Sequence, residues 1–303
     1  LLMSITHEML QNGILRLIMN KSGLTQQEID SAKDGEVKNG CLILTKVEYK
    51  ISTFEKRKDF KFVIAKNLKK VSMHLFDGSS LQFAFMPEVD GVEQFSFAYC
   101  SLVAICLMKI KCVGSHVFNC CKELIQVSLL CEELDRNACF QGCKKIKILH
   151  LPNVKKIGEW QFRDCSSLTD LIIPLVEEIG DNCLFGCLNL ESIDSKLNAN
   201  QFRCSDWCSK YKSCPICRGQ LQNCLKKGKD PQNRLKIQKK LEEQKLDLLK
   251  EAGVEPVLDL KTEETKLNVQ IQKKTKDEQI EDLIVKMLEK DKDSRTKKEK
   301  TRS

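Results

Sequence analysis

A repeat of 21 to 22 residues constrains the fold of this chain more than any other feature of its sequence. The repeat is clearest in the tetrapeptides FAYC, FNCC, FQGC, FRDC and LFGC, which end at Cys100, Cys121, Cys143, Cys165 and Cys187. FDGS at 76–79 extends the series upstream in the same phase. Periods of this length are typical of solenoids, in which each repeat is one small structural unit stacked on the next.

A second, apolar pattern runs in phase with the tetrapeptides. Counted from Leu168, apolar residues fall at offsets of 3, 5, 8 and 11. The same offsets recur from four other starting points, Ile146, Leu102, Leu81 and Phe60. A unit of about 22 residues can form one short strand and a return segment, but it cannot bury its apolar side alone. We therefore expect the repeats to stack in buried columns, one with Leu149 and Leu171 and another with Phe118, Phe140 and Phe162.

The combined pattern resembles the BspA-like leucine-rich repeats, whose unit reads roughly L-x-x-I-x-L-P-x-x-V-x-x-I-G-x-x-A-F-x-x-C. The match is clearest in LTDLIIPLVEEIGDNCLFGC at 168–187 and extends over residues 49–200. The resemblance implies an α/β repeat fold, a leucine-rich-repeat solenoid of about seven 21–22-residue units with one parallel strand per repeat. The flanking segments then form a helical N-terminal cap (1–48), a cysteine-rich C-terminal cap (201–224) and a charged helical or disordered tail (225–303).

The repeats at the two ends depart from this pattern. Arg57 and Ser79 stand where the cysteine is expected, Leu184 replaces the phenylalanine, and Ser195 interrupts the last strand. Terminal repeats of a solenoid are expected to be atypical because one of their faces has no neighbouring repeat.

The cysteines favour a reducing environment. The chain has 17 of them, an odd number, and all except Cys41 lie between Cys100 and Cys224. Disulfide scaffolds usually belong to smaller secreted domains, so we expect the repeat cysteines to be buried, reduced thiols. The start, LLMSITHEML, does not read as a secretory signal, and no apolar run reaches the roughly 18 residues of a transmembrane helix. These features predict a cytoplasmic protein, or a cell-surface one if a signal peptide precedes this sequence.

The strands also predict a candidate binding surface. Residues at offsets 3 and 5 point inward, so those at offsets 2 and 4 point onto the concave face. At the N-terminal end of this face the predicted partner-binding residues are Phe62, Ile64, Phe83 and Phe85, followed along the solenoid by Cys106, Ile148, His150 and Ile172. An exposed apolar patch usually marks an interaction site. The alternative is that residues 1–48 fold over the phenylalanines as a cap.

The segments outside the repeats read mainly as helices. In the N-terminal segment, Leu10, Ile14 and Leu17 share one helical face, and Thr25 with Glu28 forms a capping box before a second helix and a strand. In the tail, Asp230-Pro231 opens a helix that Gly253 ends, and a further amphipathic stretch covers 280–288. Its short apolar stripes do not predict a long coiled coil. A solvated helix, docking on a partner helix and weak self-association through these helices all remain open.

Residues 204–217 hold a candidate metal site. Cys204, Cys208, Cys214 and Cys217 are spaced C-x3-C-x5-C-x2-C, and four thiolates can enclose a tetrahedral zinc ion. The ending CPICRG resembles the last ligand pair of a RING finger, but no earlier C-x2-C pair or ligand histidine is present to complete one. The alternative is a cap of the solenoid with reduced cysteines. No cofactor other than this zinc is expected.

No pattern in the sequence suggests catalysis. The four histidines have no spacing typical of a triad, and phosphate-loop and dinucleotide motifs are absent. The net charge of +8 comes largely from a mixed-sign tail with few aromatic residues, which does not favour nucleic-acid binding. We therefore expect a non-enzymatic protein-protein interaction scaffold that binds a partner through the concave face. The alternatives are a zinc-containing, RING-like adaptor that recognises substrates through the repeats, and a cell-surface adhesin-type repeat protein.

Overall fold

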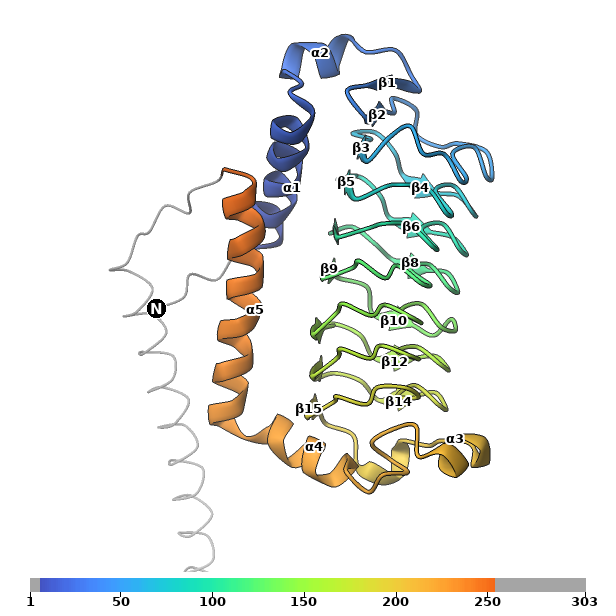
Figure 1. Ribbon diagram of the computed structural model, residues 1–303, viewed down its shortest axis with the longest axis vertical. Coiled ribbons are helices and arrows are strands. Elements are labelled where there is room, and N and C mark those ends of the chain that lie inside the picture. Colours follow the sequence, from blue (N-terminus) through green and yellow to red (C-terminus); the bar gives the residue numbers. More distant parts are fainter. Residues whose placement is uncertain (1–5, 254–303) are drawn as a thin grey trace, which may run out of the picture. The chain divides into compact units, whose positions relative to one another are not determined.

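The computed structural model describes residues 6–253, which all fall in one compact unit of the chain (Figure 1). The predicted amphipathic stretch at 280–288 and the last dozen residues lie outside the described residues. The helices are α1 (His7–Ser22), α2 (Gln26–Ser31), α3 (Asp206–Tyr211), α4 (Leu221–Lys229) and α5 (Pro231–Glu251), with a 3-10 turn at Ala199–Gln201. None of these helices combines the length and apolar character needed to cross a lipid bilayer.

The repeats stack as a solenoid in which every turn contributes one longer strand to a parallel row. These strands are β3 (Phe62–Ile64), β5 (Phe83–Phe85), β7 (Ala104–Leu107), β9 (Gln126–Leu129), β11 (Ile148–His150), β13 (Asp170–Ile173) and β15 (Ser192–Ser195). Strands β3, β5, β7 and β9 pair in one sheet and β11, β13 and β15 in another, in the register that the repeat length dictates, so Leu149 lies opposite Leu171. The predicted leucine column is therefore confirmed.

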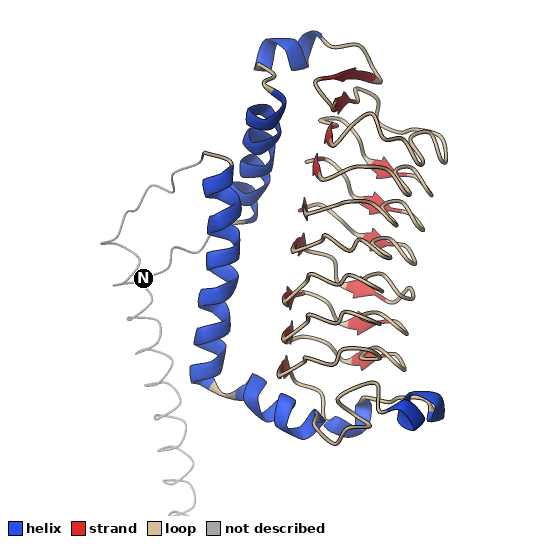
Figure 2. Ribbon diagram, viewed as in Figure 1, coloured by secondary structure: helices blue, strands red, loops and turns tan. Residues whose placement is uncertain are grey.

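Each return segment adds a second, two-residue strand that the sequence did not predict (Figure 2). These strands are β4 (Lys70–Val71), β6 (Gly91–Val92), β8 (Cys112–Val113), β10 (Glu133–Leu134), β12 (Lys156–Ile157) and β14 (Glu178–Ile179). β4, β6 and β8 pair in parallel as one sheet, and β10, β12 and β14 pair in parallel as another. In most of these strands the apolar residue at offset 11 points into the core and its neighbour points outward. The sequence did not reveal these strands, because two residues are too few to show an alternating pattern.

The regular spacing of the phenylalanines produces a continuous stack of rings through the core. Phe76, Phe97, Phe118, Phe140 and Phe162 are fully buried. Successive ring centroids lie 5.6, 5.7, 5.4 and 6.3 Å apart, with interplanar angles of 10 to 21°. The stack confirms the second predicted column, and it is the favourable offset arrangement of aromatic rings.

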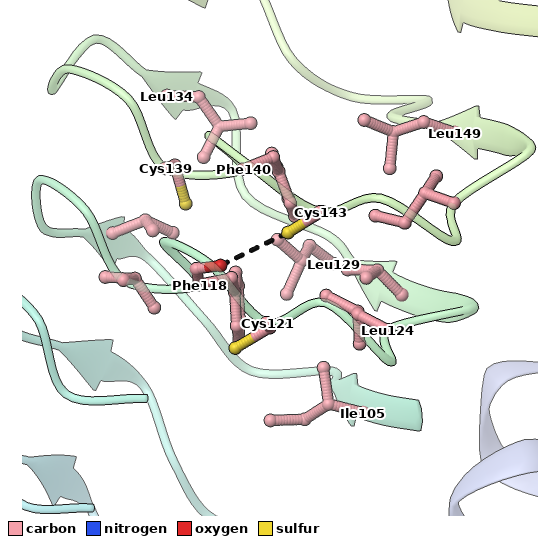
Figure 3. Packing of buried hydrophobic residues seen from close by; sticks show 14 of the residues in the cluster. Ile105, Phe118, Cys121, Leu124, Leu129, Leu134, Cys139, Phe140, Cys143 and Leu149 are labelled. Atoms are coloured by element: carbon pink, nitrogen blue, oxygen red, sulfur yellow. Dashed lines mark hydrogen bonds between the residues drawn. The ribbon is translucent and has the colours of Figure 1, made fainter. Parts of the chain in front are cut away.

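The repeat cysteines form a ladder of hydrogen bonds beside this stack. Each Sγ donates to the backbone carbonyl of the phenylalanine in the preceding turn, as Cys143 does to Phe118 at 3.2 Å (Figure 3). The equivalent bonds of Cys100, Cys121, Cys165 and Cys187 measure 2.9 to 3.1 Å. Because a thiol must keep its proton to donate, this ladder requires the reduced, neutral cysteine that the sequence predicted.

Because the repeat thiols are buried, the free energy of unfolding should fall as the pH rises through the alkaline range. Burial raises the pKa of Cys165 from 9.0 to about 12, and it also raises the pKa values of Cys121 and Cys143 well above their usual range. The unfolded chain therefore loses these protons first. The stabilisation is complete below pH 9 and is lost as the pH rises from 9 toward 12, by about 1.4 kcal/mol per pH unit for each thiol. We expect urea unfolding of a Cys165→Ala variant to show a correspondingly shallower fall above pH 9 than the parent chain. Identical pH dependence of the two proteins would contradict the buried, protonated state.

A hairpin closes the N-terminal end of the solenoid. β1 (Glu36–Lys38) pairs antiparallel with β2 (Cys41–Ile43), and β2 pairs in parallel with β3. β2 ends at Ile43, and the chain then turns to complete the first rung, where the Val47 carbonyl accepts the Lys69 N–H. The capping box of Thr25 and Glu28 is present at the start of α2, as predicted.

Candidate functional site

The predicted concave face is the surface formed by the outward-pointing residues of β3 to β15, called the strand face below. Its N-terminal half is not open. Phe62, Phe83 and Phe85 are only 4 to 8% exposed, and with Ile64 and Cys106 they form one apolar cluster with α1. The sequence prediction of an exposed patch is therefore wrong for the chain in this conformation, and the N-terminal segment covers the phenylalanines. A partner could reach these side chains only by displacing α1.

α1 is fixed at both ends and anchored along one face. Thr6 caps its start by accepting the Met9 N–H at 3.1 Å, and Gly23 ends it in the left-handed conformation. The residues that it buries against the strand face include Leu10, Ile14, Leu17 and Ile18. Three of these formed the predicted apolar stripe, and the surface that they cover is the one named in the alternative prediction of an N-terminal cap over the phenylalanines.

α5 packs beside α1 and continues along the strand face (Figure 1). Leu249 is fully buried and projects at Gly13 of α1, where a Cβ atom would lie 2.2 Å from the leucine Cδ2. Asn20 donates to the Ala252 carbonyl at 2.8 Å, and Lys21 pairs with Glu251 at 2.7 Å. The glycine therefore permits a close approach of the two helices. Among the interpretations left open for this helix, a freely solvated one is wrong.

The C-terminal half of the strand face makes a smaller apolar cluster with α5 than the N-terminal half makes with α1. Ile237 and Leu241 pack on Ile148, with Ile172 at the edge of the same small cluster. Arg234 of α5 pairs with Asp194 at 2.5 Å, and Lys240 lies 3.8 Å from Asp170. This half of the face therefore presents two apolar side chains, Ile148 and Ile172, each opposite an aspartate of the neighbouring strand.

A cavity of about 540 Å³ remains between α5 and the strand face. Its lining includes His7, Gln126, Ser128, His150, Ile172 and Lys245. Burial, followed by the positive charges of Lys245 and His7, lowers the pKa of His150 to about 4. Burial also lowers the pKa of His7. His150 is therefore neutral near pH 7, and the predicted residues His150 and Ile172 face a mixed polar and apolar cavity.

The four cysteines predicted as a metal site lie together at the C-terminal end. The Sγ atoms of Cys204, Cys208, Cys214 and Cys217 all lie within 4.8 Å of one another. Cys208 comes from α3, and Cys214 and Cys217 come from the turn after it. Burial acts to raise the pKa of Cys217, but hydrogen bonds from Cys214 and Cys208 outweigh it and lower that pKa. Such a group of thiols can bind a soft divalent metal.

A complete RING finger needs two such sites, and residues 6–253 contain no second cysteine and histidine group of this kind. The buried repeat thiols have raised pKa values, because burial disfavours their thiolates, so they lack the reactivity of catalytic cysteines.

Comparison with known proteins agrees with the observed repeat. The BspA type leucine rich repeat region matches residues 48–136 and 133–219, in 6 copies. A search of curated proteins found no significant match.

Solved structures of several bacterial repeat proteins are similar. A leucine-rich repeat protein from Bacteroides ovatus is 28% identical (TM-score 0.40), with 50% of this chain and 47% of that one covered. A leucine rich repeat protein from T. pallidum is 20% identical (TM-score 0.33), with 51% and 64% covered. A leucine rich cell surface protein from Faecalibacterium prausnitzii is 13% identical (TM-score 0.27), with 52% and 63% covered. This chain thus spans about half to two thirds of their lengths. With the family pattern matched over more than half of its residues, the chain belongs to the BspA-type leucine-rich repeat proteins.

Proposed function

We propose that the protein is a non-enzymatic scaffold that binds a helical segment of a protein partner on the strand face. One observation carries this proposal: the strand face already accepts two amphipathic helices, α1 and α5, of its own chain. A row of outward apolar residues on short parallel strands thus works as a groove for helices. Helix-in-groove binding is a common mode of peptide recognition, in which apolar residues three or four positions apart act as anchors.

The partner helix competes with α5 rather than with α1. α1 buries four large apolar residues, whereas α5 reaches the C-terminal half of the face through Ile237 and Leu241. The accompanying pair of Arg234 and Asp194 is partly exposed, and such ion pairs contribute only about 0 to 1 kcal/mol. The cavity beside His150 and Ile172 supports this choice, because α5 leaves space in this half of the strand face.

The chemistry of the face defines the partner. To pack on Ile148 and Ile172, the partner helix needs two apolar residues four positions apart, as Ile237 and Leu241 are on α5. Asp170 and Asp194 favour basic residues three positions after and three positions before the first apolar residue, where Lys240 and Arg234 stand relative to Ile237 on α5. We therefore propose a basic amphipathic helix as the bound segment.

We place this interaction in the cytoplasm, because the thiol ladder needs protonated, reduced cysteines. In the alternative cell-surface role, the same face would bind the partner.

A peptide with the sequence of residues 230–253 tests the groove directly. We expect this labelled peptide to bind a chain shortened at residue 229, and to bind the full chain more weakly because α5 occupies the groove. Ile172→Asp in the shortened chain should weaken binding at least about tenfold, since the helix would bury an unpaired carboxylate. The matched control is Leu175→Asp, at a residue of the same repeat that is 45% exposed. Fluorescence anisotropy gives the affinity of the peptide for the full chain, the shortened chain and the two variants of the shortened chain.

Two results would overturn the proposal. One is failure of the peptide to bind a shortened chain that still shows a cooperative melting transition. The other is equal binding by the full chain, the shortened chain and the Ile172→Asp variant.

A further inference from the structure

We infer that Cys204, Cys208, Cys214 and Cys217 bind one structural zinc ion that holds the C-terminal cap on the solenoid. The inference rests on the placement of the sulfurs. Cys208 Sγ and Cys217 Sγ lie 3.9 Å apart, and Cys214 Sγ and Cys217 Sγ lie 3.5 Å apart. In a tetrahedral zinc site with Zn–S bonds of about 2.3 Å, neighbouring sulfurs are about 3.8 Å apart. A disulfide would need about 2.05 Å.

The local backbone presents the sulfurs to a single point. The C-x2-C segment forms a tight turn in which the Arg218 N–H bonds to the Cys214 carbonyl at 3.2 Å. Gly219 follows in the left-handed conformation, which a glycine adopts without strain. Cys208 and Cys214 are fully buried, and Cys204 and Cys217 are partly buried. Four protein ligands leave no position open for a substrate, so the site is structural rather than catalytic.

The same segment takes the place of the next solenoid turn. In the preceding turn, the Trp160 and Asp164 N–H groups donate to the Asp181 and Phe185 carbonyls. In the last turn, the equivalent Asn182 and Gly186 N–H groups donate to the carbonyls of Arg203 and Ser213, at 3.0 and 2.6 Å.

These two acceptors stand immediately before two proposed ligands, Cys204 and Cys214. The irregular segment around the cysteines must therefore hold the Arg203 and Ser213 carbonyls where a regular solenoid turn would place its acceptors. A zinc ion that joins four points of this segment supplies the required rigidity, and its binding free energy becomes folding free energy of the cap.

The experiment uses the full chain, purified under reducing conditions and stripped of metal with a chelator. Added Co²⁺ serves as the spectroscopic probe. We expect one equivalent to bind, with the sulfur-to-metal charge-transfer and intense visible bands of a tetrahedral cobalt–thiolate site, and one equivalent of Zn²⁺ to displace it. Zinc should also raise the melting temperature by roughly 5 °C or more.

Two variants separate this site from the other thirteen cysteines. Cys214→Ser with Cys217→Ser should abolish the cobalt bands, whereas Cys112→Ser, at an exposed thiol outside the cluster, should leave them unchanged. The parent chain alone decides the matter if the double variant fails to fold. No uptake of Co²⁺ or Zn²⁺ by the reduced, folded parent would overturn the inference, as would thiolate bands that persist in the double variant. A Cys214–Cys217 disulfide that forms in place of metal binding would overturn it too.

Discussion

Replacing Phe97 with alanine is expected to lower the free energy of unfolding by about 3–5 kcal/mol. Phe97 is fully buried and its ring stacks between those of Phe76 and Phe118, with centroids 5.6 and 5.7 Å away. Its removal leaves a cavity that the neighbouring turns cannot fill, because their backbones are fixed by the ladder of hydrogen bonds. Urea denaturation followed by circular dichroism measures the loss.

Phe95 in the same turn provides the matched control. Its ring stacks between His74 and His116, at 5.1 and 4.7 Å, but it is only partly buried on the outside of the return segment. Phe95→Ala should therefore cost about 1–2 kcal/mol. Equal losses for Phe95→Ala and Phe97→Ala would show that the inner ring stack is not the main source of stability.

Gly158→Ala is expected to destabilise the chain by about 2–3 kcal/mol. A Cβ atom at this position would lie 2.4 Å from the Asp135 carbonyl oxygen and 2.8 Å from the Arg136 carbonyl oxygen. Both atoms belong to the backbone of the preceding turn, so two turns would have to move apart. Reduced entropy of the unfolded chain favours alanine by only about 0.4–1 kcal/mol, so the steric effect prevails. Thermal unfolding of the Gly158→Ala variant and the parent chain measures this difference in stability.

Gly91→Ala tests whether the effect comes from this contact or from glycine itself. A Cβ atom there would meet the Cys112 Sγ at 3.4 Å and the Lys70 Cγ at 3.9 Å, which are ordinary contacts. Neither Gly91 nor Gly158 has a positive φ, so the two positions differ mainly in available space. We expect Gly91→Ala to be neutral or slightly stabilising. A loss similar to that of Gly158→Ala would refute the steric explanation.

The repeats could be predicted because their signal is local and recurs many times. The central copies place their leucine, phenylalanine and cysteine at the same offsets, so stacking aligns Leu149 with Leu171 and Phe140 with Phe162. The hydrogen bond from each cysteine to the preceding turn follows from the same geometry. Errors in one copy do not matter when the other copies agree.

The position of α1 over the phenylalanines was predicted only as one of two alternatives, and that of α5 was not predicted, because both depend on contacts between distant segments. The apolar stripes on both helices were visible, but a stripe does not reveal which surface it covers. Gly13 in the middle of α1 was the available signal, since glycine disfavours helices unless another chain approaches closely. Its meaning depends on Leu249, which lies at the far end of the described chain.

The cysteine spacing predicted the four candidate ligands but not the structural task of the segment around them. That task depends on the Arg203 and Ser213 carbonyls, which the repeat pattern does not mark. Backbone acceptors of this kind have no sequence signature, because every residue carries a carbonyl.

Methyl–methyl nuclear Overhauser effects test the stacking of the repeats most directly. The side chains of Leu149 and Leu171 belong to adjacent strands in matched register, and both are buried in the same core. With these methyl groups assigned in the folded protein, a strong cross-peak between the two leucines is expected, together with one between Leu171 and Ile193. If both cross-peaks are missing from a spectrum that shows the other core contacts, the turns do not stack as described.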